Sequence, residues 1–104
     1  MKLRAWLRER TPPPPPRLAA RIEETLGDRC EQDDAEATDL CVSAAGELLH
    51  ELLARPSAGR ESALDLLTVD ALVTYAFEAA SREPASLAVR ATNAMSRLAS
   101  AARE

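Results

Sequence analysis

A run of five consecutive prolines, Pro12–Pro16, divides the sequence close to its start. Proline lacks the backbone N–H that helices and sheets use, so the interior of neither can hold this run. The run favours an extended polyproline II strut, about 15 Å long at ~3.1 Å per residue. We therefore expect three parts: a short amphipathic arm over residues 1–11, a polyproline linker over 12–16 and one domain over 17–104.

The composition predicts that the domain belongs to the all-α class. Alanine and leucine are the commonest residues, whereas isoleucine occurs once and aromatic residues make up 3% of the chain. Helices favour alanine, leucine, arginine and glutamate, and strands favour β-branched and aromatic residues. We expect a small antiparallel bundle of about four helices, to which the prolines tether the N-terminal arm.

Apolar periodicity places the helices of the bundle over residues 15–27, 33–55, 58–82 and 84–102. The second helix is expected to begin at Asp33, because an acidic cap followed three residues later by Glu36 is a variant of the capping box. The third helix is apolar around most of its circumference. It is therefore expected to be sheltered on several sides, either as the central helix or as part of a subunit interface.

Six apolar side chains are the candidate partner-binding residues: Leu3, Trp6 and Leu7 on the arm, and Leu66, Val73 and Phe77 on the third helix. Large aromatic residues concentrate binding energy at interfaces, and this chain has one tryptophan. The arm is predicted to dock into a groove on a neighbouring molecule or to fold back on its own bundle, and the sequence leaves both arrangements open.

Charge is distributed unevenly along the chain. Basic side chains dominate residues 1–21, and acidic side chains dominate residues 22–51. Attraction between the two segments would either orient a second copy or pair them within one chain. Peripheral contact with anionic lipid through Lys2, Arg4, Arg8 and Arg10 is a further alternative. The net charge of −4 gives no support to nucleic-acid binding.

Glu47 and His50 have the Glu-x-x-His spacing by which di-iron helical bundles bring two ligands to one metal. With Glu51 they would form half of a site that a symmetric dimer completes. The chain has one histidine, however, and helical periodicity places it on an outward face. A surface histidine is the favoured interpretation, so no metal or other cofactor is expected, and an iron-type metal-binding bundle is the alternative function.

Two cysteines are too few for a disulfide scaffold. Cys41 is expected to be a small core residue and Cys30, near a helix junction, to be the more exposed of the two. Arg4 and Arg8 interrupt any apolar region of a secretory signal, and no window reaches the roughly 18–20 apolar residues of a membrane span. A cytoplasmic protein without integral membrane association is therefore expected.

The sequence contains no Gly-rich phosphate loop and no spacing that suggests a catalytic serine, so an enzyme is not the favoured interpretation. The proline run, with the arginine- and glutamate-rich helical segment after it, is similar to linkers in bacterial anti-sigma factors, a resemblance that implies no activity. We expect a small non-enzymatic helical interaction or scaffold module. It would bind a protein partner or itself through the third helix and the Trp6-bearing arm.

Overall fold

The computed structural model describes residues 1–55, 59–82 and 87–103, and over these residues the fold is all-α. In chain order the elements are α1 (Leu3–Arg8), α2 (Pro16–Leu26), the 3₁₀ turns η1 (Gly27–Glu31) and η2 (Asp34–Glu36), α3 (Ala37–Ala54), α4 (Arg60–Ala80) and α5 (Leu87–Arg103). The predicted fold class, a small helical bundle, is confirmed. The expected start of the last helix at residue 84 lies outside the described residues.

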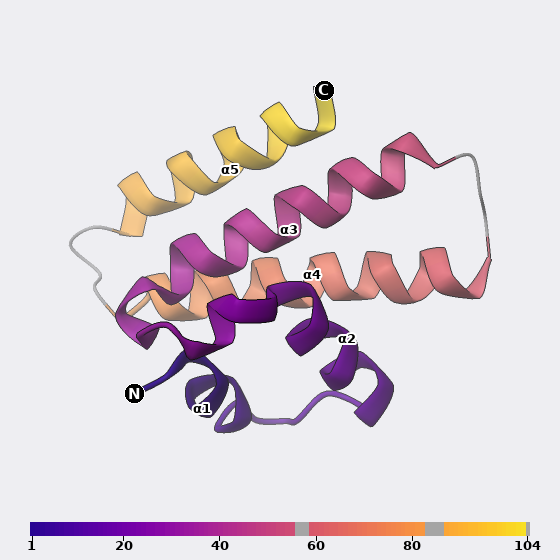
Figure 1. Ribbon diagram of the computed structural model, residues 1–104. Helices are drawn as coiled ribbons and strands as arrows, with labels where there is room; N and C mark the ends of the chain where they lie inside the picture. Colours follow the sequence, from indigo (N-terminus) through magenta and orange to yellow (C-terminus); the bar gives the residue numbers. More distant parts are fainter. Residues whose placement is uncertain (56–58, 83–86, 104) are drawn as a thin grey trace.

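α3 is the helix on which most of the others pack (Figure 1). α4 returns antiparallel along α3, and α5 lies on the side of α3 that faces away from α1 and α2. α3 thus takes the central position that the sequence offered as one of two alternatives for the helix over 58–82, although α4 also contacts α2, α3 and α5. The reason is the small residues of α3: a Cβ built at Gly46 would lie 3.7 Å from the Cβ of Ala101, so α5 approaches α3 closely.

One hydrophobic core includes the arm as well as the bundle. Leu3, Trp6 and Leu7 of α1 are buried in the same cluster as Ile22 and Leu26 of α2. The same cluster continues into α3, α4 and α5 through Cys41, Ala44, Leu72, Ala76 and Ala94. The prolines consequently do not hold the arm away from the domain; the extended linker leads from α1 back along the bundle to α2, which begins at Pro16.

The beginning of α3 differs from the expected capping box. The side chain of Asp33 accepts the N–H of Ala35 at 2.8 Å, but this contact caps η2 and not α3. Glu36 immediately precedes α3 and makes no side-chain capping bond. The capping-box prediction is wrong because residues near Asp33 pair with the N-terminal segment: the N–H of Leu3 donates to the carbonyl of Gln32 at 2.8 Å, which keeps this stretch out of the helix.

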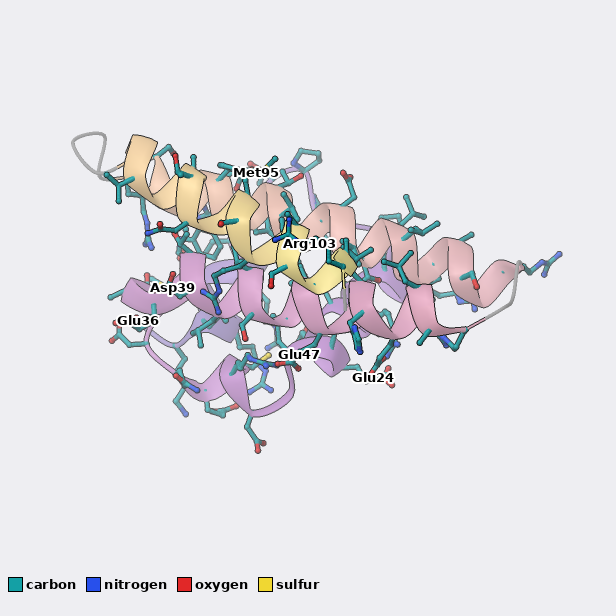
Figure 2. The ribbon with its side chains drawn as sticks, turned by 90° about the horizontal axis from the view of Figure 1, so that it is seen from above. Glu24, Glu36, Asp39, Glu47, Met95 and Arg103 are labelled. Carbon is teal, nitrogen blue, oxygen red and sulfur yellow. The ribbon has the colours of Figure 1, made fainter. Side chains whose placement is uncertain are left out.

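α5 ends well short of the far end of the α3–α4 hairpin, as Figures 1 and 2 both show. The last turns of α3 and the first turns of α4 therefore extend beyond the cover that α5 provides. Across the described ranges, none of the helices combines the length and the apolar character that crossing a bilayer requires.

Candidate interaction surface

The arm folds back on its own chain. Leu3 is fully buried, Trp6 is 3% exposed and Leu7 is buried beside them. Of the two arrangements that the sequence left open, the structure shows docking within one molecule. These three side chains are therefore part of the core of their own chain. A partner protein could contact them only if α1 detached from the bundle.

Trp6 is held from several directions. Its ring meets the ring of Tyr75 edge to face, with centroids 6.4 Å apart. The guanidinium of Arg10 lies 4.2 Å from the Trp6 centroid and that of Arg82 lies 5.2 Å from it, both within the range of cation–π attraction. Tyr75 lies in α4 and Arg82 follows that helix. Through these contacts, Trp6 packs the arm against the C-terminal half of the chain.

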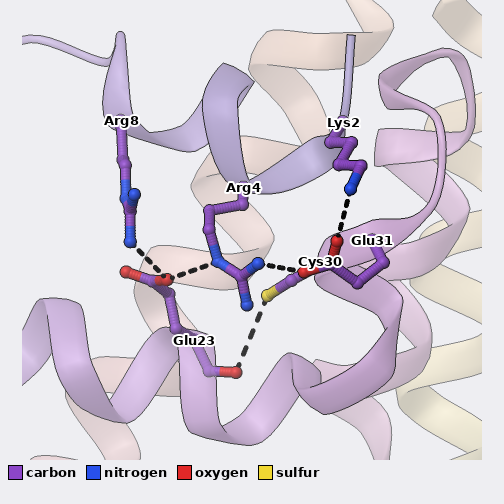
Figure 3. A network of polar contacts seen from close by, with 6 residues as sticks. All are labelled: Lys2, Arg4, Arg8, Glu23, Cys30 and Glu31. Atoms are coloured by element: carbon purple, nitrogen blue, oxygen red, sulfur yellow. Dashed lines mark hydrogen bonds and ion pairs between the residues drawn. The ribbon is translucent and has the colours of Figure 1, made fainter.

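The basic arm pairs with acidic side chains of its own chain (Figure 3). Arg4 donates from Nε to Glu23 at 3.1 Å and also binds Glu31. Lys2 and Arg8 extend the network to the same two carboxylates, at 2.9 Å and 3.2 Å. Hydrogen bonds from Lys2 and Arg4 lower the pKa of Glu31. The attraction between the basic and acidic segments thus acts within one molecule.

Asp65 of α4 is a buried carboxylate that the sequence analysis did not single out. Its side chain accepts Nε of Arg21 at 2.8 Å and Nη2 of Arg55 at 2.9 Å, while the residue is 4% exposed. The hydrogen bond from Arg21 is the main cause that lowers the pKa of Asp65, and burial opposes it. This aspartate joins α2, the end of α3 and α4. An available signal was its helical alignment with Leu72 and Ala76 on an apolar face.

The outward face of α4 carries the most exposed leucines of that helix. Leu66 is 56% exposed and its neighbour Leu67 is 55% exposed. Val73 and Phe77 are half-buried and lie along the same side of the helix as Leu66, at the spacing of one face. We call these four residues the α4 outer face. The single chain packs α4 against α2, α3 and α5, with Leu72 and Ala76 buried, and leaves Leu66 and Leu67 more than half exposed.

The structure does not bring the alternative metal ligands together. The carboxylate of Glu47 is bound by Arg29. His50 lies beside Glu47 in a shallow groove between α3 and α5, together with Arg97. Glu51 lines a second depression next to α2, which Glu47 also borders and His50 does not. Among the residues that the structure describes, no group of three histidine, cysteine or acidic side chains is placed to hold a metal ion. The iron-type half-site stays a prediction without a geometric basis.

Both cysteines are reduced and fully buried. The expectation that Cys41 is a core residue is confirmed. The expectation that Cys30 is the more exposed of the two is wrong, because η1 turns it inward, where its thiol donates to the carbonyl of Glu23 at 3.7 Å. Burial raises the pKa of Cys30, and it raises the pKa of Cys41 to about 12.

We expect both thiols to resist alkylation in the folded protein, because the thiolate is the nucleophile and a raised pKa depletes it. At neutral pH, iodoacetamide should label Cys30 and Cys41 at least about 100-fold more slowly in the folded chain than in urea, as followed by mass spectrometry. An Ala20→Cys variant supplies an exposed thiol as the control. Labelling of either native cysteine at the rate of Cys introduced at position 20 would contradict this assignment.

Comparison with known proteins adds no family assignment: no family model, no curated protein and no solved structure matches this chain.

Proposed function

We propose that this chain is a small helical interaction module that self-associates through the α4 outer face. The observation that carries the proposal is the pair of adjacent leucines, Leu66 and Leu67, each more than half exposed on a regular helix. Val73, which packs partly against the core, and the half-buried Phe77 add a smaller exposed area on the same side of the helix. The arm is left out of this interface because its apolar side chains are already buried.

Charge on α4 favours a second copy of the chain as the occupant. Arg60 begins the helix, and Asp70 lies about 15 Å further along its axis at ~1.5 Å per residue. Both are exposed and flank Leu67 on the outward side. Two α4 helices packed antiparallel would place Arg60 of each copy near Asp70 of the other, whereas parallel packing would oppose like charges.

The amount of apolar surface indicates weak association. Full burial of a leucine contributes about 1.5–3 kcal/mol, so covering the exposed half of one contributes roughly 1 kcal/mol. A symmetric pair would cover four such leucines and gain ~4 kcal/mol, which only matches the low end of the cost of association, about 4–15 kcal/mol. Any net affinity must come from the exposed parts of Val73 and Phe77 and from the Arg60–Asp70 pairs, so association is weak. We therefore expect a monomer–dimer equilibrium that depends on concentration.

Sedimentation equilibrium tests this proposal. The wild-type mass should rise from monomer toward dimer as concentration increases into the millimolar range, and the double variant Leu66→Glu with Leu67→Glu should remain monomeric. Val89→Glu is the matched control, because Val89 is 63% exposed and lies on a different helix, α5. Arg60→Glu should weaken association, and adding Asp70→Arg should restore it.

A wild-type protein that stays monomeric at every concentration would refute self-association. Unchanged dimerisation of the double leucine variant would refute the α4 outer face as its site. Failure of the charge exchange to restore association would refute the antiparallel arrangement.

A further inference from the structure

A pocket lies where the arm, the linker and α2 meet α4. Its apolar walls are Leu7 of α1, Pro13 and Pro14 of the linker, Ala19 and Ile22 of α2, and Tyr75 of α4. The charged side chains of Arg8, Arg10 and Glu23 complete the lining. The pocket exists because the arm docks on its own chain, and it lies apart from the α4 outer face.

The size of the pocket limits its occupant. The cavity measures about 160 Å³. A cavity of roughly 150 Å³ lined by apolar side chains is large enough to bind benzene. A single six-membered ring therefore fits this space.

The prolines give the pocket a preformed wall. Pro13 and Pro14 have no backbone N–H and a fixed φ, so this wall presents apolar ring carbons in a stiff backbone. Another part of the wall is Ile22, which is nearly fully buried and packs in the core. A ligand entering such a pocket loses little free energy to ordering of the protein.

Charge at the pocket favours an acidic group on the ligand. Two guanidinium groups line it against one carboxylate, and that carboxylate already accepts hydrogen bonds from Arg4 and Arg8. Arg8 is largely exposed and donates to Glu23 through Nη2. Arg10 donates to the carbonyl of Trp6 through Nε, lies over the Trp6 ring and forms an ion pair with Glu78 at 3.9 Å through Nη1. Each guanidinium carries five N–H donors, so both retain donors for a second acceptor.

We propose that this pocket binds a small aromatic monocarboxylate. The ring lies between Leu7, Ile22 and Tyr75, and the carboxylate accepts hydrogen bonds from Arg8 and Arg10. Such a ligand contacts α1, the linker, α2 and α4 at once, so it also holds the arm in its docked position.

Amide resonances followed by nuclear magnetic resonance during titration test this site, with benzoate, benzyl alcohol and benzylamine as the probes. Benzoate should bind the wild type with a Kd on the order of 1 mM, and benzylamine should bind at least about fivefold more weakly. Ala19→Leu fills the pocket and should weaken benzoate binding about tenfold or more. Ala20→Leu, one residue further along the same helix and exposed, is the matched control and should leave the Kd within about twofold.

If the Ala19→Leu variant does not fold, the Arg8→Gln variant still tests benzoate binding at this pocket. Arg8→Gln removes an exposed side chain and should weaken benzoate binding several-fold while leaving benzyl alcohol binding unchanged. The proposal fails if benzylamine binds as tightly as benzoate, or if benzoate leaves the resonances of Leu7, Ile22 and Tyr75 unmoved. It also fails if Arg8→Gln weakens both probes equally.

Discussion

Replacement of Trp6 by alanine should lower the free energy of unfolding by about 3–5 kcal/mol, the range found when a buried aromatic side chain is truncated. The indole is 3% exposed, lies edge to face with Tyr75 and is covered by Arg10 and Arg82. A domain of this size has a total stability of roughly 5–15 kcal/mol. Loss of Trp6 should therefore remove a large part of the stability of the whole bundle.

Urea unfolding followed by far-ultraviolet circular dichroism measures this effect. Trp6→Phe keeps a ring against Tyr75 and should cost less than half as much as Trp6→Ala. Leu67→Ala, a truncation of a side chain that is 55% exposed, is the surface control and should change stability by less than about 1 kcal/mol. A Trp6→Ala variant as stable as this control would show that α1 is not part of the cooperative core.

The helices and the fold class follow from the sequence because they depend on local patterns. Apolar residues at helical spacing, prolines that exclude regular structure and the scarcity of β-branched residues each act within a few turns of chain. The same spacing placed Leu3, Trp6 and Leu7 on one side of the arm, and the structure buries all three. Local periodicity therefore identified which side chains are sheltered.

Periodicity does not identify which residues pack against these buried side chains. Whether Trp6 packs in one molecule or between two depends on Tyr75 and Arg82, which lie about seventy residues away in the sequence and are brought near by the α3–α4 hairpin. The central position of α3 has a similar origin. Its Gly46 permits close approach of α5, whereas the local pattern alone, a helix apolar around most of its circumference, favours a central position for α4.

Local patterns say least about the partners of buried polar residues. Helical spacing aligns Asp65 with the apolar face of Leu72 and Ala76, but it does not show that Arg21 and Arg55 surround the carboxylate. The two arginines lie on either side of α3 in the sequence and approach the same carboxylate only in the folded chain. Such a site depends on the relative placement of three elements, which no local pattern encodes.

Asp65→Asn should lower the free energy of unfolding by about 2–3 kcal/mol at neutral pH. Removing one partner of a fully buried ion pair costs about 3–5 kcal/mol, because the other charge is left uncompensated. Here the side chains of Arg21 and Arg55 are 26% and 43% exposed, so water can partly solvate them, and a smaller loss is expected. Urea unfolding gives the value, and Asp70→Asn on the exposed side of α4 should change stability by less than about 0.5 kcal/mol.

The pH dependence distinguishes an electrostatic role of Asp65 from a purely steric one. The arginines lower the pKa of Asp65 in the folded chain below its value in the unfolded chain, which is about 3.9. Its contribution to stability is therefore complete above that unfolded value and is lost as the pH falls toward the folded pKa. Because asparagine does not titrate, the stability difference between wild type and Asp65→Asn should shrink as the pH falls below about 4. A difference that stays constant down to the acid transition would show that the side chain acts through its shape and not through its charge.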